Sequence, residues 1–342
     1  MSYISKKLIL WHKTHGRHQL PWQNTENPYA IWVSEIMLQQ TQVSTVIGYY
    51  QKFITRFPDI DRLAIADIDE VNELWSGLGY YNRARNLHAA AKIISKNYKG
   101  IFPDQYEKIL ELPGIGRTTA GAICAFSFGQ HYPILDGNVK RVFARFFGIK
   151  EWTGLPLVEK ELWKIAEKNL PMTSIQVYTQ ALMDLGATLC VRSKPRCGEC
   201  PLKNSCKSFL NQWTSIIPAP KVRKKIPVKE GHILIVQYAE QILFVKRDLR
   251  KIWGGLWSLP ELEKKDDLDQ WLLKFLKIKK SRTMNEGIYN ATFSHYKYVM
   301  HYQHILIDNI NIKIPENHQW LAKTEIQQAG VPTPIKKLLV SL

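Results

Sequence analysis

Leu112-Pro-Gly-Ile-Gly-Arg-Thr-Thr-Ala-Gly-Ala-Ile123 joins two segments with helical periodicity, the first ending near Glu111 and the second starting near Arg117. Two glycines in it, Gly114 and Gly116, allow a turn that is too tight for side chains. The first amides of the second helix have no partner within the helix, so they can bind a phosphate group. An ordinary corner between two helices is the alternative interpretation.

Four cysteines follow with the spacing C-x6-C-x2-C-x5-C, at Cys190, Cys197, Cys200 and Cys206. Zinc ligands usually come as two short pairs, whereas one compact loop around a single object favours a [4Fe-4S] cluster. A pair of disulfides would need an oxidising compartment, and the N-terminal residues do not resemble a secretory signal. The fifth cysteine, Cys124, lies in an Ala-, Gly- and Phe-rich segment and is predicted to be a small buried hydrophobic residue.

The composition predicts a globular protein that binds a polyanion. The chain has 342 residues, enough for two or three domains, and its 45% apolar content includes 11 Trp and 15 Tyr for sizeable cores. Its uninterrupted apolar runs are only a few residues long, so we expect no membrane span and a cytoplasmic, nucleoid-associated protein. The 47 basic and 30 acidic residues give a net charge of +17, which favours nucleic acid as partner through counterion release.

The periodicity of the chain predicts two domains and a linker. Residues 1–215 have apolar residues three and four apart almost throughout, which predicts an all-α domain containing the cysteine loop. Residues 216–231 are rich in Pro and Lys and are predicted to be an extended linker. Residues 232–342 are predicted to form an α+β domain, with paired strands at 232–238 and 241–247, a helix at 267–276 and further strand at 288–307.

A carboxylate interrupts the apolar stripe of the segment Pro28–Val43, which is predicted to be one helix. Glu35 lies four residues after Ile31 and three before Leu38, so it shares their face of the helix. Burial would raise its pKa toward neutrality, which suits a general acid. The alternative is a partly exposed glutamate bonded to a neighbouring helix.

A second carboxylate, Asp136, precedes a segment whose Val139, Val142 and Phe143 form an apolar stripe. Asp136 is therefore predicted to be the N-cap of a helix, and capping alone could explain it. A helix N-terminus also keeps a carboxylate ionised, so we expect a low pKa for Asp136 beside a raised pKa for Glu35. One acid and one anion are the pair that glycoside hydrolysis uses, and cleavage of an N-glycosidic bond passes through a similar cationic sugar.

The hairpin followed by the cysteine loop resembles the endonuclease III superfamily of DNA base-excision glycosylases. Over nearly its whole length the chain is similar to one family of that superfamily, the A/G-specific adenine DNA glycosylases or MutY family. The motifs that carry this resemblance are Leu20-Pro-Trp22, Trp32-Val-Ser-Glu-Ile-Met-Leu-Gln-Gln-Thr-Gln-Val43, Trp75-Ser-Gly-Leu-Gly-Tyr-Tyr81 with Arg83-Ala-Arg85, the hairpin, Leu135-Asp-Gly-Asn-Val139 with Arg141, and the cysteine loop.

The resemblance implies a monomeric enzyme that excises adenine paired with 8-oxoguanine or guanine in double-stranded DNA. In it Glu35 would protonate N7 of adenine and later help to activate water, and Asp136 would stabilise the sugar cation. Gln40 and Tyr80 would wedge into the base stack, with Thr41 and Leu78 near the orphaned 8-oxoguanine, although each could equally be core or helix surface. The residues expected to contact DNA are Gln40, Thr41, Leu78, Tyr80, Gly114, Gly116, Thr118, Lys140, Phe293, Ser294 and His295.

One position of the hairpin separates two kinds of glycosylase. Relatives that also cleave the strand carry a lysine two residues after the second glycine, where this chain has Thr118. A hydroxyl cannot form the imine with the sugar that strand cleavage needs, so we expect a monofunctional glycosylase. Lys140, one turn after Asp136, could still reach the abasic sugar adventitiously. The alternatives are a pyrimidine glycosylase with lyase activity, like endonuclease III, and a non-enzymatic iron–sulphur DNA-binding protein.

The C-terminal domain resembles the Nudix-like module of the same family. Trp253-Gly-Gly-Leu-Trp-Ser-Leu-Pro-Glu261 is similar to the start of a Nudix hydrolase box, but Glu263 leads into Lys264-Lys265-Asp266-Asp267 instead of the magnesium-binding glutamates. We therefore expect no hydrolysis of free nucleotides. Phe293-Ser294-His295 resembles the loop that probes the modified guanine, and a plain hairpin tip is the competing interpretation. A sliding clamp and a mismatch-repair protein are further partners that no residue here assigns.

Overall fold

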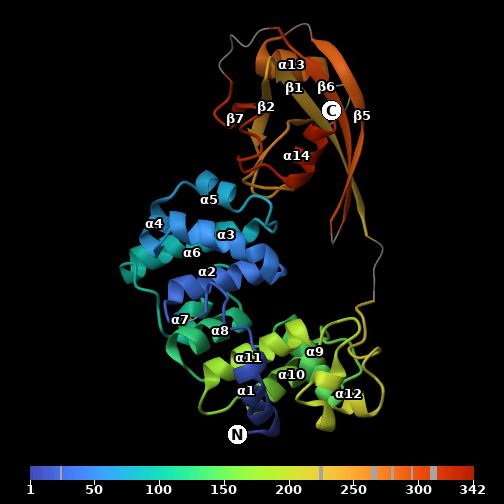
Figure 1. Ribbon diagram of the computed structural model, residues 1–342. Helices are drawn as coiled ribbons and strands as arrows, with labels where there is room; N and C mark the ends of the chain where they lie inside the picture. Colours follow the sequence, from blue (N-terminus) through green and yellow to red (C-terminus); the bar gives the residue numbers. More distant parts are fainter. Residues whose placement is uncertain (24, 223–225, 263–267, 279–280, 294–295, 309–313) are drawn as a thin grey trace. The chain divides into compact units, whose positions relative to one another are not determined.

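The computed structural model describes residues 1–342 except 24, 223–225, 263–267, 279–280, 294–295 and 309–313 (Figure 1). The chain forms two compact units. The helical unit consists of Met1–Ile65 and Asn86–Arg223, and the C-terminal unit consists of Ala66–Arg85 and Lys224–Leu342. The predicted classes, all-α and α+β, are confirmed. Residues 66–85 group with the C-terminal residues, although they lie inside the helical part of the sequence.

The helical unit contains a succession of mostly short helices. They are α1 (Tyr3–His15), α2 (Pro28–Leu38), α3 (Val43–Arg56), α4 (Ile60–Ile65), α6 (Asn82–Tyr98, whose first turn belongs to the C-terminal unit), α7 (Tyr106–Leu110), α8 (Arg117–Phe128), α9 (Gly137–Phe147), α10 (Pro156–Asn169), α11 (Ile175–Thr188), two 3-10 turns (Cys197–Glu199 and Lys203–Ser205) and α12 (Lys207–Leu210). In the parts of the chain described, no helix combines the length and the apolar character needed to cross a membrane.

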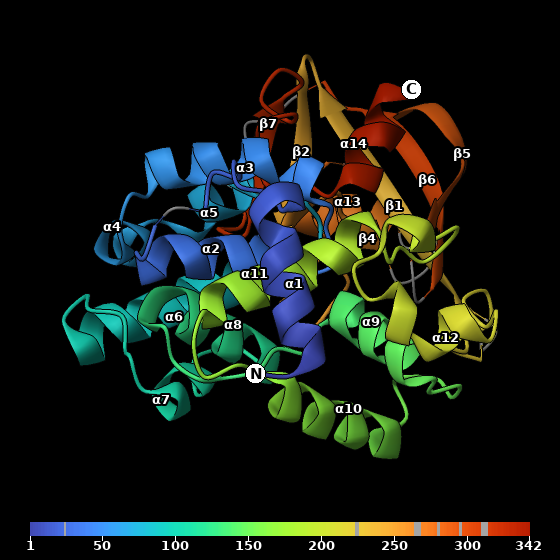
Figure 2. The ribbon, with the colours of Figure 1, turned by 60° about the horizontal axis from the view of Figure 1, so that its bottom comes forward.

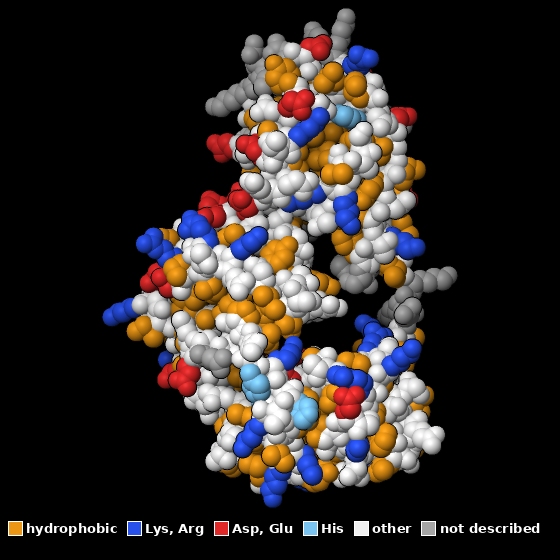
Figure 3. All heavy atoms as spheres, in the orientation of Figure 1, with side chains coloured by type: hydrophobic (Ala, Val, Ile, Leu, Met, Phe, Trp, Pro, Cys, Tyr) orange, Lys and Arg blue, Asp and Glu red, His pale blue; other side chains and the backbone are white. Residues whose placement is uncertain are grey.

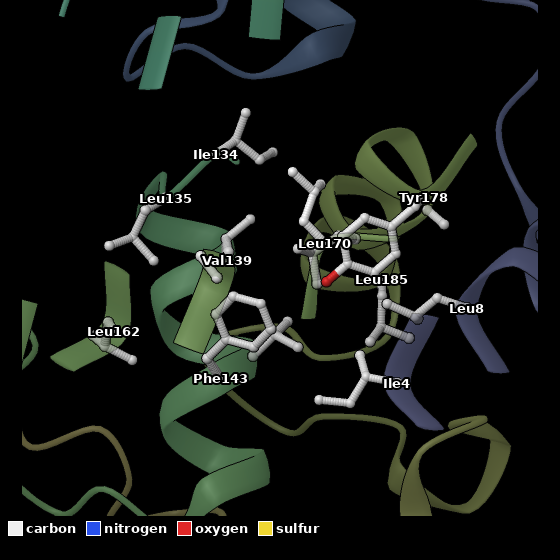
Figure 4. Close-up of a cluster of buried hydrophobic side chains, with 14 of the residues drawn as sticks. Ile4, Leu8, Ile134, Leu135, Val139, Phe143, Leu162, Leu170, Tyr178 and Leu185 are labelled. Atoms are coloured by element: carbon white, nitrogen blue, oxygen red, sulfur yellow. The ribbon is translucent and has the colours of Figure 1, made fainter. Parts of the chain in front are cut away.

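A core of apolar side chains joins α1, α9, α10 and α11. The helix α1 packs along α11, and α9 contacts both α10 and α11 (Figure 2). Leu8 of α1, Phe143 of α9 and Leu185 of α11 are fully buried, and Figure 4 shows their side chains converging. Burial of each such side chain contributes roughly 1.5–3 kcal/mol, so this cluster fixes the orientation of α9. Cys124 of α8 is buried, as predicted.

The predicted hairpin is present, since α7 ends at Leu110 and α8 starts at Arg117. Gly114 has a φ of 80°, and a Cβ atom there would lie 2.8 Å from the Cβ atom of Asn86. Gly116 is the N-cap of α8 with a φ of −100°, and a Cβ atom there would meet nothing within 4 Å. Only Gly114 therefore requires glycine on conformational grounds.

The helix that carries Glu35 is shorter than predicted. It ends at Leu38, and a new helix begins at Val43, so the prediction of one helix over Pro28–Val43 is wrong in its last turn. Gln40 between them has a φ of 57°, which a right-handed helix cannot contain. The chain thus makes a sharp turn directly after the face on which Glu35 lies.

The C-terminal unit is built on one mixed sheet. Among the described residues its strands are β1 (Val228–Tyr238), β2 (Gln241–Lys246), β3 (Trp257–Ser258), β4 (Glu261–Leu262), β5 (Arg282–Thr292), β6 (Lys297–Leu306) and β7 (His318–Ala322), in the order β3-β2-β1-β6-β5, with β4 beside β1 and β7 beside β2. The strands β1 and β6 are parallel, while β1 with β2 and β5 with β6 are antiparallel. Since β1 begins at Val228, the strand includes the end of the segment predicted as linker.

Both faces of β1 are covered. Ile233 and Ile235 lie in one apolar cluster with residues of α14 (Thr333–Val340), and Leu234 and Val236 lie in another with residues of α13 (Leu268–Leu276). Successive side chains of a strand point to opposite faces, so the two helices cover opposite faces of the sheet. The helix α5 (Ile68–Leu74), from the earlier part of the chain, completes this unit.

We predict different responses to alanine at the two hairpin glycines. Gly114→Ala should lower the free energy of unfolding by about 1–3 kcal/mol, because alanine is strained at positive φ and its methyl group would collide with Asn86. Gly116→Ala should change it by less than about 0.5 kcal/mol, since the site is open. Urea unfolding of the two variants checks this, and equal losses would contradict the assignment of the strained position.

Candidate active site

Glu35 lines a cavity of the helical unit. This cavity, about 720 Å3 in volume, is lined by Glu35 together with Trp22, Ile31, Leu38 and Met183. Burial, and after it the negative charge of Asp136, raises the pKa of Glu35 from its ordinary value to about 8. Glu35 is therefore protonated at neutral pH and holds a proton at the wall of a pocket large enough for a nucleobase. The predicted rise in pKa is confirmed.

Asp136 lies at the N-terminus of α9, as predicted. Its Oδ1 accepts a hydrogen bond from the Val139 amide at 2.8 Å, and its Oδ2 accepts one from Nδ2 of Asn138 at 3.2 Å. The predicted low pKa is wrong, because burial raises the pKa of Asp136 more than the hydrogen bonds and the charge of Arg141 lower it. The negative charge of Asp136 nevertheless raises the pKa of Glu35, so the two carboxyl groups share one electrostatic site.

Two threonines in the first turn of α8 connect the segments that carry the carboxyl groups. Nε2 of Gln39, just after α2, donates to Oγ1 of Thr119 at 3.3 Å. The amide of Leu135, just before Asp136, donates to Oγ1 of Thr118 at 3.4 Å. Because the two threonines are adjacent, the hairpin helix holds the end of α2 and the start of α9 together.

A chain of hydrogen bonds leads from Asp136 to the cysteine loop. Asn138, which bonds Asp136, accepts at Oδ1 from Nη2 of Arg141 at 2.8 Å. Nε of Arg141 donates to the carbonyl of Cys190 at 2.7 Å, and its Nη2 also donates to the carbonyl of Gly186 at 2.7 Å. The carboxylate and the first cysteine are therefore tied to the same helix.

The four cysteines of the loop line one small cavity and form no disulfides. Arg145 of α9 lies against this cavity, and its Nη1 is 3.5 Å from Sγ of Cys190. Burial raises the pKa values of the Cys197, Cys200 and Cys206 thiols, that of Cys200 to about 12. Within the described residues, no three His, Cys, Asp or Glu side chains converge closely enough to hold a single metal ion, so the thiols surround the cavity rather than meet at one point.

The sequence analysis missed a buried carboxylate that holds two polar side chains of the pocket wall. Asp184 of α11 is fully buried and accepts hydrogen bonds from Nε of Arg17 and Nε2 of Gln180, each at 2.8 Å. Burial would raise the pKa of Asp184, but hydrogen bonds from His12 and Arg17 outweigh it and the pKa is lowered. Arg17 and Gln180 line the cavity, so Asp184 orients two of its polar groups. The signal was the one that indicated Glu35, a carboxylate within an apolar stripe.

The residues predicted to contact DNA are distributed over both units. In the helical unit Gln40, Gly114 and Gly116 are exposed, and Thr41 and Thr118 are half-buried. Lys140 bonds Glu159 at 2.8 Å. Exposed Arg192, Lys194, Arg196 and Lys207 belong to the cysteine loop and α12, where Figure 3 shows Lys and Arg side chains gathering.

In the C-terminal unit Tyr80 is 47% exposed and Leu78 only 5% exposed. Phe293 is half-buried, with its ring stacked on Tyr296 at 4.6 Å between centroids and packed near Trp253. Ser294 and His295 lie outside the described residues. The structure thus brings Glu35 and Asp136 together, whereas Leu78, Tyr80 and Phe293 belong to the other unit.

The helical fold with this hairpin, and a carboxyl group of raised pKa at a nucleobase-sized pocket with a second carboxyl group acting on it, define a base-excision glycosylase of the helix-hairpin-helix class. Residues 33–168 match the family described as "HhH-GPD superfamily base excision DNA repair protein", and residues 232–341 match the NUDIX domain family. The chain is 43% identical over 338 residues to the adenine DNA glycosylase of Buchnera aphidicola subsp. Baizongia pistaciae, covering 98% of this chain and 95% of that protein. It belongs to the adenine DNA glycosylases, which are enzymes of base excision repair.

More distant relatives agree with this placement. The human adenine DNA glycosylase is 30% identical over 398 residues, covering 97% of this chain and 72% of the human protein. Among solved structures, a thermostable thymine-DNA glycosylase is 29% identical with a TM-score of 0.56, covering 60% of this chain and 95% of its own. The family resemblance inferred from the motifs is therefore confirmed, and the endonuclease III-like and non-enzymatic alternatives give way to it.

The raised pKa of Glu35 predicts a pH-dependent difference in stability between the wild type and Glu35→Gln. Because the folded-state pKa lies above the unfolded value, the carboxyl group loses stabilising free energy as pH rises from about 4.5 to about 8. Glu35→Gln lacks this titration. Its free energy of unfolding should therefore rise relative to that of the wild type by up to about 1.4 kcal/mol for each pH unit. Urea unfolding at about pH 5.5 and 7.5 measures this gain, and an unchanged difference would show an ordinary pKa.

Proposed function

We propose that this protein removes adenine mispaired with 8-oxoguanine or guanine in double-stranded DNA, by hydrolysing the N-glycosidic bond without cleaving the strand. The observation that carries the proposal is a protonated carboxyl group at a pocket wall with a second carboxyl group beside it. Glu35, whose pKa is raised to about 8, lines a cavity of about 720 Å3, and the charge of Asp136 acts on it. An adenine that is flipped out of the DNA double helix would enter this cavity.

In this mechanism Glu35 donates its proton to N7 of adenine, so the base leaves as a neutral molecule. Asp136, fixed by Val139 and Asn138, supplies the negative charge that stabilises the sugar cation. Once the base has left, ionised Glu35 can accept a proton from the attacking water. Glu35 thus starts the reaction in the protonated state that its burial and the charge of Asp136 favour. The hydrogen bonds from Val139 and Asn138 and the charge of Arg141 favour the ionised form of Asp136, against the effect of its burial.

The proposed reaction stops at the abasic site because the hairpin offers no amine that could form an imine. Thr118 occupies the hairpin position where a lyase needs lysine, and its Oγ1 accepts the Leu135 amide. Lys140 of α9 is paired with Glu159 at 2.8 Å. An ammonium group held by a carboxylate is a poor nucleophile, since it must first lose its proton.

The DNA would be held by the hairpin and by residues with unusual backbone geometry. The exposed turn at Gly114 and Gly116 presents the first amides of α8 to a phosphate group. Gln40 and Tyr80, the proposed wedge, both have left-handed φ angles, 57° and 51°. Such conformations are costly outside glycine and concentrate at functional sites. Phe293, with Ser294 and His295, is proposed to read the base opposite adenine.

Cys190, Cys197, Cys200 and Cys206 are proposed to hold a [4Fe-4S] cluster. Their thiols surround one cavity, and the cationic Arg145 beside Cys190 suits a cluster of negative thiolates. The cluster would order the basic loop that contacts phosphate groups and would take no part in the chemistry on the base. Arg145 of α9 would hold the loop in the same position together with the cluster.

A base-release assay tests the reaction. Duplexes carrying adenine opposite 8-oxoguanine or guanine should lose adenine, while adenine opposite thymine should not, and strand breaks should require added alkali or heat. Release of a pyrimidine, or nicking without such treatment in proportion to base release, would contradict the proposal.

Glu35→Gln and Asp136→Asn test the two carboxyl groups. Glu35→Gln keeps the shape but cannot donate the proton, so adenine release should be lost while mispair binding stays nearly intact. Asp136→Asn keeps a side chain that can cap α9, so its single-turnover rate should fall through the loss of roughly 3–6 kcal/mol of charge stabilisation. A rate above a tenth of the wild-type value in either variant would overturn this site.

The cluster assignment predicts iron in the purified protein. Anaerobically prepared protein should be brown, and Cys197→Ser should lose both the colour and much of the DNA affinity, because the basic loop is no longer ordered. Cys124→Ser serves as the control, since that buried cysteine lies outside the loop. Metal analysis that finds zinc and no iron would refute the assignment.

A further inference from the structure

The loop that carries Leu78 and Tyr80, residues 76–81, belongs to the C-terminal unit. Its flanking helix α5 and the first turn of α6 lie in the same compact unit as the sheet β1–β7. The sequence does not predict that these segments group together, because residues 66–85 and residues 224–342 are far apart along the chain. Specific polar contacts hold the two segments together.

The first contact joins α5 to two neighbouring strands. Oδ1 of Asp69 is 2.5 Å from Nζ of Lys246 in β2, and Oδ2 of Asp69 accepts from Nε1 of Trp257 in β3 at 3.2 Å. Lys246 and Trp257 are cross-strand partners, so both oxygens of one carboxylate are held by a rigid pair. The ion pair is only about one-third exposed, and the indole N–H has a charged acceptor.

The second contact holds the start of the loop. Nζ of Lys336 in α14 donates to Oγ of Ser76 at 2.8 Å and to the carbonyl of Gln327 at 2.7 Å. Burial lowers the pKa of Lys336, although the charge of Glu73 opposes this shift. At the far end of the loop, Nη1 of Arg85 donates to the carbonyl of Gly254.

Close packing accompanies these polar contacts. Gly330 approaches α5 so closely that a Cβ atom there would lie 3.1 Å from the Cβ atom of Asn72. Asn72 is only 1% exposed. The loop itself is braced by Arg83, whose guanidinium lies 5.4 Å from the ring centres of Trp75 and Tyr80 and donates to the carbonyl of Gly79 at 3.1 Å.

We propose that the C-terminal unit pre-organises the loop 76–81 for DNA, with Asp69, Lys246, Trp257 and Lys336 as positioning residues for Leu78 and Tyr80. A loop that is already ordered loses less entropy on binding, so contacts that fix it raise affinity without touching the ligand. The left-handed Tyr80 needs such support, because strained backbone persists only where its surroundings over-determine it. The C-terminal unit thereby raises the affinity for every mispair, independently of any recognition of the base opposite adenine. This inference rests on the proposed function for the identity of the ligand, a mispaired duplex.

The matched pair Lys336→Ala and Lys337→Ala tests the proposal. The two lysines are adjacent on α14 and each variant removes one positive charge, but Lys337 is exposed and only Lys336 bonds Ser76. Lys336→Ala should weaken binding of a duplex with adenine opposite guanine by about tenfold, and Lys337→Ala by less than about twofold. Fluorescence anisotropy with labelled duplex measures both. Equal losses of affinity in the two variants would show that Lys336 acts only through its positive charge, and would overturn the proposal.

Asp69→Ala separates positioning from electrostatics by the sign of its effect. Removing a negative charge should strengthen DNA binding if charge alone matters. Loss of the contacts to Lys246 and Trp257 should instead weaken binding by about three- to tenfold. Glu316→Ala, which removes an exposed carboxylate of the same unit, is the control and should leave binding unchanged or slightly tighter. Tighter binding by Asp69→Ala would overturn the proposal.

Hydrogen exchange tests the loop without DNA or catalysis. Amides of residues 76–85 should exchange about tenfold faster in Lys336→Ala and Asp69→Ala than in the wild type, and at wild-type rates in both controls. Unchanged exchange would overturn the anchoring, and faster exchange without weaker binding would overturn its role in recognition. A wild type that binds mispairs but releases no adenine would refute the proposed function alone. A wild type that binds no duplex would refute both the proposed function and the role of the positioning residues in binding.

Discussion

The buried guanidinium of Arg145 determines how the chain leaves the helical core. It is only 3% exposed and donates to the carbonyls of Val191, Arg192 and Ile217 at 2.7, 3.0 and 2.9 Å. An arginine keeps its charge in a protein, so its burial requires acceptors in these directions. The start of the cysteine loop and the segment that leads away from the helical unit are therefore both held by one side chain of α9.

The helix α9 consequently serves two centres at once. Its N-terminus positions Asp136, whose charge acts on Glu35, while Arg141 and Arg145 further along bond the cysteine loop. Because the apolar face of α9 is packed into the core that it shares with α1, α10 and α11, the two ends of the helix are held as one rigid element. The loop that would grip the DNA backbone and the group that would stabilise the sugar cation share one rigid support.

The sequence predicted those parts of the site that depend on local pattern. Glu35 stood out because a carboxylate interrupts an apolar stripe, and the cysteine spacing indicated one loop. The left-handed conformation of Gln40, which keeps α2 and α3 from forming one helix, could not be predicted, since glutamine has no preference for a left-handed backbone. The pKa of Asp136 depends on burial by distant segments, which local capping rules do not include. The pairing of Asp69 with Lys246 likewise joins residues that are 177 positions apart and leaves no periodic signal.

The discontinuity of the C-terminal unit has a consequence for the order of folding. During synthesis residues 66–85 leave the ribosome long before β1–β7. The helix α5 therefore cannot make its contacts with the sheet until the strands have been synthesised, while the helical segments on both sides of it can already fold. Closing so long a stretch of chain carries a loop-closure entropy that only the finished sheet can offset. A nascent chain that stops before β2 and β3 would keep Asp69 without its two donors. The loop bearing Leu78 and Tyr80 should thus be among the last parts of the protein to acquire its native structure.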